Sequence, residues 1–381
     1  MMRPMKLAGS ELLFGKGALA YLKQVKAGKT AIVIGGSSML KSGILKKVED
    51  YLHESGSETF VISGVEADPH FSTVMRGAGE MKKNQPDLIV ALGGGSVMDA
   101  AKTMWIYYEH EELSSLEELF PPHVFPKLHT KARFCCIPST SGTASEVSRS
   151  VVITDDKTGL KRGLGNMEMM PDIAICDPEV TVSMPPRITA ETGMDALTHA
   201  LEALVSNRAN YVSDILAERA VEDIFANLPQ AYADGTNMAA REKMIDASMI
   251  AGLAFTNVSL GIVHSMAHTV GSFFHISHGL ADAILLPYVM KFNTAEPYAK
   301  AVYERMTEKL GCTDIIQSVA ELNRTLGIPS ALKEVIQDRE QYMKQLDRMA
   351  EVALADGCTK TNPIIPTVAQ FKELLTEAYN G

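Results

Sequence analysis

The stretch Asp87-Leu-Ile-Val-Ala-Leu-Gly-Gly-Gly-Ser-Val-Met-Asp-Ala-Ala-Lys102 predicts a buried strand that passes through a glycine turn into a helix. Glycines in such a turn let the backbone approach a phosphate closely, and the N–H groups at a helix start favour an anion. The spacing fits neither the GxGxxG dinucleotide fingerprint nor the P-loop. A structural interpretation is equally open and compatible with phosphate binding: the glycines form a tight turn, and Ser96 with Asp99 makes a variant capping box.

The alternation of strands and helices continues on both sides of this stretch. Strand-like runs at 30–34 and 59–63 are followed by helical patterns at 41–52 and 72–83, and the runs 134–137 and 173–176 read as further strands. Such alternation is typical of βαβ units and a parallel sheet. The run 151–154 predicts a hairpin closed by 156–159. We therefore expect an α/β, Rossmann-like N-terminal domain.

Three prolines mark the expected end of this domain. Pro178, Pro185 and Pro186 disfavour helix in the residues before them, and helical periodicity replaces the strand-like runs from Thr189 to the end. The sequence therefore predicts two domains, an α/β domain over 1–184 and an all-helical domain over 185–381.

Composition narrows the class of protein. The chain has 381 residues, with 46 Asp and Glu against 36 Lys and Arg, giving a formal net charge of −10. This charge and the lack of a basic patch argue against nucleic-acid binding. No apolar run is long enough for a membrane span, and residues 1–10 lack the apolar core of a signal peptide. The five cysteines are an odd number without a CxxC pair, which favours reduced thiols and a cytoplasmic location.

A second polar loop follows the predicted strand at 134–137. The stretch Pro138-Ser-Thr-Ser-Gly-Thr-Ala-Ser-Glu146 has five hydroxyl groups that could bind ribose or phosphate. A capping box between Thr143 and Glu146 at a helix start is the alternative, and the pattern alone slightly favours it.

Histidines gather in the predicted helical domain. Asp195 and His199 are four residues apart, as are His264 and His268, so each pair lies on one helix face. His275 and His278 follow closely. Three imidazoles and one carboxylate suit a divalent ion such as Fe(II) or Zn(II). Spacing alone does not decide which four residues form the site, and a single buried histidine is more often a hydrogen-bonded core residue.

These segments together resemble the iron-containing alcohol dehydrogenase family, from about Gly15 to Thr367. The motifs that carry the resemblance are Gly93-Gly-Gly-Ser-Val-Met-Asp-Ala-Ala-Lys102, Ser139-Thr-Ser-Gly-Thr-Ala-Ser-Glu-Val147, Asp195-Ala-Leu-Thr-His199, Ala251-Gly-Leu-Ala-Phe255, His264-Ser-Met-Ala-His268 and His278-Gly279. The resemblance implies a dehydroquinate synthase-like two-domain architecture, with a dinucleotide-binding domain, a helical metal-binding and catalytic domain, and often a homodimer.

The resemblance also assigns roles to residues. It places the metal ligands on Asp195, His199, His264 and His278, and it places His268 beside the nicotinamide and substrate, where His268 is our candidate for the proton relay. His275 matches no functional position, and we interpret it as structural. The predicted cofactor-binding residues are Gly36, Ser37, Gly94, Gly95, Ser96, Asp99, Ser139, Thr140, Thr143 and Lys161.

The implied function is an NAD(P)-dependent, divalent-metal-dependent alcohol dehydrogenase or aldehyde reductase acting on a small alcohol or aldehyde. The metal is expected to be Fe²⁺ or Zn²⁺. NADP(H) is favoured over NAD(H), because NAD-preferring members of the family carry an Asp at the position of Gly36, where it would repel a 2′-phosphate. Two alternatives stay open: a zinc enzyme similar to glycerol dehydrogenase or dehydroquinate synthase, and a non-catalytic nucleotide- or metal-binding protein.

Overall fold

The computed structural model describes residues 5–381. The chain divides into two compact units, one ending at Met184 and the other running from Pro185 to Gly381.

The first unit is built on a six-stranded sheet in which every neighbouring pair is parallel. Its strands are β1 (Glu11–Phe14), β2 (Lys29–Val33), β3 (Glu58–Ile62), β4 (Leu88–Gly93), β5 (Arg133–Pro138) and β8 (Ile173–Cys176), in the spatial order β1-β8-β5-β4-β2-β3. The predicted parallel sheet is confirmed. The sequence pattern did not predict β1, a four-residue edge strand with two exposed and two partly buried side chains, which pairs with β8.

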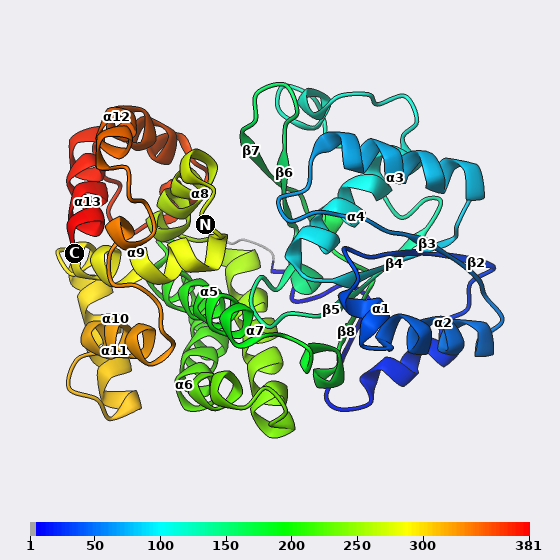
Figure 1. Ribbon diagram of the computed structural model, residues 1–381, viewed down its shortest axis with the longest axis horizontal. Helices are drawn as coiled ribbons and strands as arrows, with labels where there is room; N and C mark the ends of the chain where they lie inside the picture. Colours follow the sequence, from blue (N-terminus) through cyan, green and yellow to red (C-terminus); the bar gives the residue numbers. More distant parts are fainter. Residues whose placement is uncertain (1–4) are drawn as a thin grey trace. The chain divides into compact units, whose positions relative to one another are not determined.

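Helices cover both faces of this sheet (Figure 1). Helices α3 (Phe71–Asn84) and α4 (Gly95–Glu109) pack on one face, and α1 (Ser38–Lys41) and α2 (Ile44–Glu54) pack on the other. β4 serves both cores, because Ile89 and Ala91 face α3 and α4 while Leu88, Val90 and Leu92 face the opposite side. The helix expected at 41–52 is confirmed as α2, but it begins only at Ile44, because Gly43 has a left-handed φ of 78° and separates α2 from the short α1.

The expected hairpin forms a separate two-stranded antiparallel sheet. It consists of β6 (Ser150–Thr154) and β7 (Lys161–Gly165). The Asp155 carbonyl accepts a hydrogen bond from the Gly159 N–H at 2.8 Å, and the Asp155 side chain accepts one from the Lys157 N–H at 2.9 Å. The predicted turn residues thus close the hairpin.

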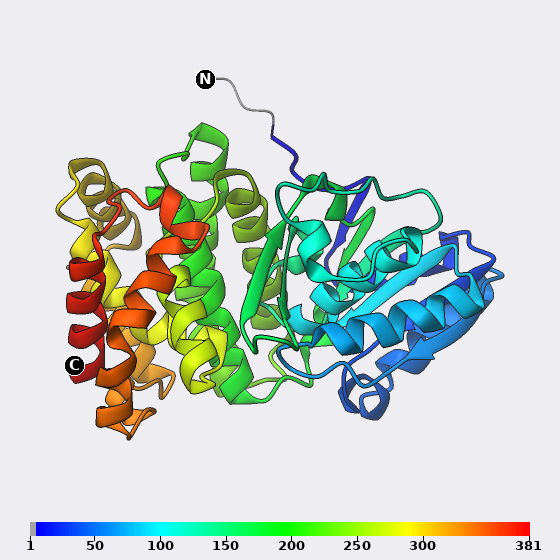
Figure 2. The same ribbon diagram turned by 90° about the horizontal axis from the view of Figure 1, so that it is seen from above.

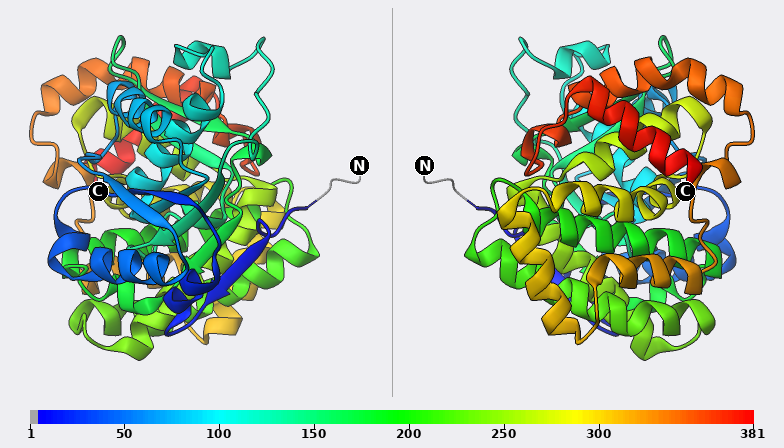
Figure 3. Two further views of the ribbon diagram at one scale, coloured as in Figure 1. Left: turned by 90° about the vertical axis from the view of Figure 1, so that its right-hand side faces the viewer. Right: turned by 90° about the vertical axis from the view of Figure 1, so that its left-hand side faces the viewer.

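The second unit contains helices only, as expected. They are α5 (Pro186–Val205), α6 (Tyr211–Ala233), α7 (Met238–Val258), α8 (Ile262–Phe274), α9 (His278–Asn293), α10 (Pro297–Leu310), α11 (Ile315–Thr325), α12 (Arg339–Ala355) and α13 (Val368–Asn380). α5, α6 and α7 pack against one another, α9 lies against α5 and α8, and the terminal helices α12 and α13 lie side by side (Figures 2 and 3). Among the described helices, none alone has the length and apolar composition of a membrane span; α7 and α8 meet those criteria only as a pair, bent by 102°.

Candidate functional site

Three helices of the second unit present the predicted metal ligands. Asp195 and His199 lie on α5, His264 on α8, and His278 at the start of α9. Gly279 allows α9 to approach α5, since a Cβ at this position would lie only 2.2 Å from the carbonyl oxygen of Glu191 on α5. Close contact between the two backbones therefore brings the first and last predicted ligands together.

One carboxylate oxygen is the centre of this cluster. Asp195 Oδ1 lies 3.5 Å from His199 Nε2, 3.7 Å from His264 Nε2 and 3.8 Å from His278 Nε2. Neither Asp195 Oδ1 nor His264 Nε2 has a hydrogen-bond partner among the described residues, although both atoms are buried. Four ligands at bond lengths of about 2.1 Å around a tetrahedral ion are separated by roughly 3.4 Å. The spacing and the unpaired atoms therefore fit a divalent metal ion.

Electrostatics keep the Asp195 carboxylate ionised. Burial by itself would raise the pKa of Asp195, but the adjacent His199, His264 and His278 outweigh it and lower that pKa below its usual range. An ionised carboxylate is the form that binds a cation.

Glu202, which the sequence analysis did not select, orients one of these histidines. Its carboxylate accepts hydrogen bonds from His264 Nδ1 at 2.6 Å, from the Val263 N–H at 2.7 Å and from the Gly261 N–H at 2.9 Å. Because Nδ1 of His264 donates a hydrogen bond to Glu202, Nε2 is the ring nitrogen that faces Asp195. The sequence signal was present: Glu202 lies three residues after His199, on the same face of α5.

His268 lies beside the cluster but is held differently. Its Nδ1 donates to Asp356 Oδ2 at 3.0 Å, and its ring stacks on that of His278 with centroids 5.1 Å apart. Asp356 also accepts a hydrogen bond from the Cys358 N–H at 2.8 Å. Burial would raise the pKa of Asp356, but the contact with His268 and the further hydrogen bonds lower it well below its usual range. His275 is exposed and ends α8 in a left-handed conformation, φ 55°, apart from the cluster.

In the first unit, the predicted cofactor-binding segments follow three neighbouring strands. Gly36 and Ser37 come after β2, Gly94 to Ser96 after β4, and Ser139 to Thr143 after β5. Because these strands are parallel neighbours, all three segments emerge at the same edge of the sheet. The chain order reverses between β2 and β4, and open α/β sheets bind ligands outside the carboxyl ends of strands at such a point.

The loops after β4 and β5 are in close contact. The Ser139 N–H donates to the Gly93 carbonyl at 2.9 Å. A Cβ on Gly95 would lie 2.7 Å from Thr143 Cγ2, and one on Gly94 would lie 3.3 Å from Thr140 Cγ2. Glycine is therefore needed for the approach of the two loops. Thr140 Oγ1 and Ser141 Oγ are buried without a hydrogen-bond partner among the described residues, so both can serve a bound ligand.

Neither capping box considered for these loops forms. α4 begins at Gly95 with Gly94 as its cap and without a side-chain capping hydrogen bond. The segment Ser145–Val147 is a single 3-10 turn, preceded by Ala144 at a φ of 50°. The first capping box was wrong because α4 already begins at Gly95, so Ser96 lies inside the helix. The second was wrong because the chain does not continue into a helix after Ser145–Val147.

Asp99 and Lys161 have protein partners. Asp99 accepts hydrogen bonds from Ser145 Oγ at 2.8 Å and from the Val152 N–H at 2.9 Å, and Lys161 Nζ pairs with Asp68 Oδ1 at 2.7 Å. Lys102, which was not among the predicted site residues, is fully buried and donates to the Ser145 carbonyl at 2.6 Å. Asp99 and Lys102 thus fix the end of the hydroxyl-rich loop.

Comparisons with known proteins match both units. Residues 9–178 match the family model "Iron-containing alcohol dehydrogenase", and residues 189–379 match "Fe-containing alcohol dehydrogenase family, C-terminal". The NADPH-dependent butanol dehydrogenase of Clostridium saccharobutylicum is 44% identical, over 97% of each chain. The bifunctional aldehyde-alcohol dehydrogenase AdhE of Escherichia coli is 37% identical over 93% of this chain, which spans 43% of that protein. An iron-containing alcohol dehydrogenase structure from Thermococcus thioreducens superposes with a TM-score of 0.93 at 35% identity, covering 99% of this chain and 100% of that one.

Proposed function

Because the chain belongs to the iron-containing alcohol dehydrogenase family, we propose that Asp195, His199, His264 and His278 bind its divalent metal. The observation that carries this assignment is the convergence of three imidazole nitrogens within 3.8 Å of Asp195 Oδ1. The enzyme interconverts alcohols and aldehydes with a nicotinamide cofactor. Both family models are of the iron type, and so they do not favour the alternatives similar to glycerol dehydrogenase or dehydroquinate synthase.

In the proposed mechanism, two carboxylates prepare two histidines for different tasks. When bound, the metal ion supplies a Lewis acid for the substrate oxygen. Glu202 holds the Nδ1 proton of His264, which directs Nε2 of that ring to the ion. Asp356 holds the Nδ1 proton of His268, so Nε2 of His268 is the nitrogen that exchanges a proton with the reacting oxygen or a water.

We assign cofactor binding to the α/β domain 1–184 and metal binding and catalysis to the helical domain 185–381. Backbone N–H groups of Gly94, Gly95 and Ser96 take the pyrophosphate, and Ser139, Thr140 and Thr143 contact the ribose and nicotinamide. The unpaired Thr140 hydroxyl supports this. Asp99 does not contact the cofactor directly in this proposal; it accepts a hydrogen bond from Ser145 and so holds the loop that carries Ser139, Thr140 and Thr143. Lys161 leaves its ion pair with Asp68 when it contacts the cofactor.

NADP(H) is the proposed cofactor. Gly36 is exposed and offers no carboxylate to repel a 2′-phosphate, and Ser37 beside it is exposed as well. The similar enzyme from Clostridium saccharobutylicum is named as NADPH-dependent. A Cβ on Gly36 would meet no atom within 4 Å, so Gly36→Asp should fold and shift the kcat/KM ratio towards NAD(H) by roughly tenfold. An unmodified enzyme that already prefers NAD(H) tenfold would contradict the assignment.

We further propose Fe²⁺ as the resident ion, with Zn²⁺ bound by the same donors, and a homodimer in the cytoplasm. Five free cysteines among the described residues suit a reducing compartment. The decisive experiment follows NADPH oxidation with butanal, using metal-free protein and protein reloaded with Fe²⁺ or Zn²⁺. Activity that depends on the added ion is expected, and full activity without metal would refute the proposal. Light scattering of the same sample tests the dimer.

A further inference from the structure

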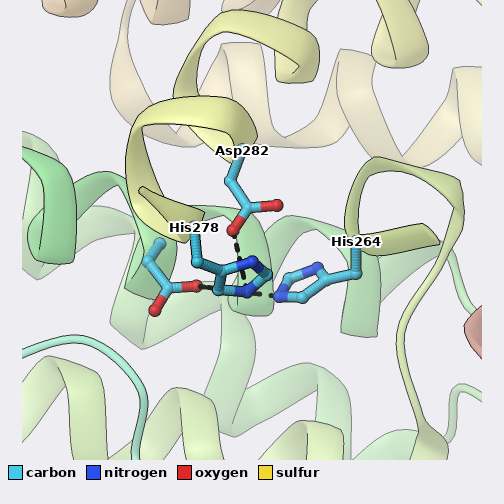
Figure 4. A group of neighbouring side chains, drawn as sticks. His264, His278 and Asp282 are labelled. Carbon is cyan, nitrogen blue, oxygen red and sulfur yellow. Dashed lines mark ion pairs between the residues drawn. The ribbon is translucent and has the colours of Figure 1, made fainter. Parts of the chain in front are cut away.

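A second buried carboxylate faces the same cluster. Asp282 lies on α9, four residues after His278 and on the same helix face, and its side chain is fully buried. Its Oδ2 lies 3.1 Å from His278 Nε2. A dashed line joins these two side chains in Figure 4. Donor atoms of Asp195, His264, His278 and Asp282 all lie within 4.8 Å of one another.

Neither oxygen of Asp282 accepts a hydrogen bond from any described residue. A buried carboxylate without donors is costly unless it is paired or binds a cation. His278 cannot serve as that partner in the loaded enzyme, because its Nε2 has one lone pair and that lone pair is assigned to the metal. Glu202 differs in this respect, since its oxygens are occupied by two backbone N–H groups and His264.

We propose that Asp282 is a fifth protein ligand of the divalent ion, an inference that rests on the four-ligand site proposed above. Two carboxylates then balance the charge of the ion. Of the three imidazoles, those of His264 and His278 belong to the group of donors within 4.8 Å of one another, whereas His199 lies outside that group and contacts Asp195 Oδ1 at 3.5 Å. Four protein ligands suit tetrahedral zinc, whereas a further carboxylate oxygen favours ions that accept more and harder ligands, such as Mn²⁺ and Fe²⁺. Asp282 is thus a determinant of metal selectivity.

The test measures metal binding, independently of turnover. Metal-free wild-type protein and Asp282→Asn are titrated with Mn²⁺ and Zn²⁺ in competition with a chromophoric chelator. Asn keeps the size of the side chain but removes its charge. We expect Asp282→Asn to weaken Mn²⁺ binding by roughly 10- to 100-fold and Zn²⁺ binding by less. Asp246→Asn is the matched control, because Asp246 on α7 also has a buried, unpaired Oδ1 but lies outside the cluster.

Loading the wild type and Asp282→Asn with Co²⁺ provides a second, spectroscopic readout. Tetrahedral Co²⁺ absorbs visible light much more strongly than Co²⁺ with five or six ligands. A weak spectrum for the wild type, altered in Asp282→Asn, supports the fifth ligand. An intense tetrahedral spectrum, or Mn²⁺ affinity equal in wild type and Asp282→Asn, would overturn the fifth ligand and leave the four-ligand site intact. Wild-type protein that binds none of these ions would overturn both proposals.

Discussion

The two units each bury a cluster of charged side chains, and the clusters differ in how their polar atoms are satisfied. In the α/β unit, Lys102, Asp99 and Ser145 hydrogen-bond to one another and to nearby backbone groups. In the helical unit, Asp195 Oδ1 and His264 Nε2 face each other at 3.7 Å without a hydrogen bond. In the first cluster, protein groups supply the hydrogen-bond partners. In the second, unpaired nitrogen and oxygen atoms are arranged so that they can bind an ion. Several unpaired atoms that face one another, rather than burial or charge, therefore distinguish a binding site from a structural network.

The largest expected effect comes from breaking the helical cluster. His264→Ala removes a ligand, and we expect loss of bound metal together with a decrease in kcat on the order of 10³-fold, while the chain stays folded. Metal analysis, steady-state kinetics and circular dichroism check the three parts. Turnover that falls while metal remains stoichiometric would show that His264 is not a ligand.

Disrupting the hydrogen-bonded cluster of Lys102, Asp99 and Ser145 should lower folding stability and leave metal binding unchanged. Lys102→Met removes the positive charge beside the buried Asp99 carboxylate and the hydrogen-bond donor to the buried Ser145 carbonyl. We expect this loss to lower the unfolding free energy by about 3 to 5 kcal/mol. Urea denaturation measures it, with the exposed Lys16→Met as control. A destabilisation below about 1 kcal/mol would mean that the network contributes as little as a surface pair.

Glu146 sharpens the comparison, because it is a buried carboxylate of the α/β unit with one unpaired oxygen, Oε2. Burial raises its pKa from 4.5 to about 7. The unfolded chain therefore loses this proton at a lower pH than the folded protein does, so folding stability falls as pH rises from about 4.5 to 7. The total cost is about 3 kcal/mol.

Glu146→Gln should remove this dependence. We expect the variant to be more stable than the wild type at pH 8 and to have a flatter stability profile between pH 5 and 7. Thermal or urea melts across that range provide the measurement. Parallel profiles for the two proteins would indicate that Glu146 is ionised throughout.

The smallest expected effect of the four concerns His268, which contacts the helical cluster yet has a full hydrogen-bond partner in Asp356. His268→Ala should retain stoichiometric metal but lower turnover by roughly 10²-fold and flatten the pH–rate profile. Loss of metal in this variant would move His268 into the ligand set.

Much of the fold could be predicted because the spacing of apolar residues along the chain indicates which segments form strands and which form helices. The run 88–92 alternates between two cores, and each of its residues is buried, as a central parallel strand requires. β1 was missed because four residues, the first and last of them exposed, carry too little pattern. The break at Gly43 was missed because a helical pattern on both sides hides a single left-handed residue.

The site could be predicted in part. Spacing of four residues on one helix identified the candidate pairs Asp195 with His199 and His264 with His268, but spacing is equally consistent with core histidines. Glu202 and Asp356 were missed because each acts across elements distant in the chain: Glu202 reaches His264 from α5, and Asp356 reaches His268 from 88 residues away. Asp282 was missed although it lies four residues after His278 on the same helix, because only its burial inside the cluster sets it apart from other acidic residues. Which carboxylate faces which imidazole is a property of helix packing, and sequence spacing does not encode it.

Gly279 has a consequence for how this protein acquires its ion. Because a backbone-to-backbone contact sets the distance between α5 and α9, the ligand-bearing helices reach their positions by packing alone. Such a pocket is preorganised, so metal entry requires little ordering of the chain, and one ion can be exchanged for another without unfolding. Metal content would then follow the supply of ions during growth, and two preparations of one polypeptide could differ in activity with no difference in structure.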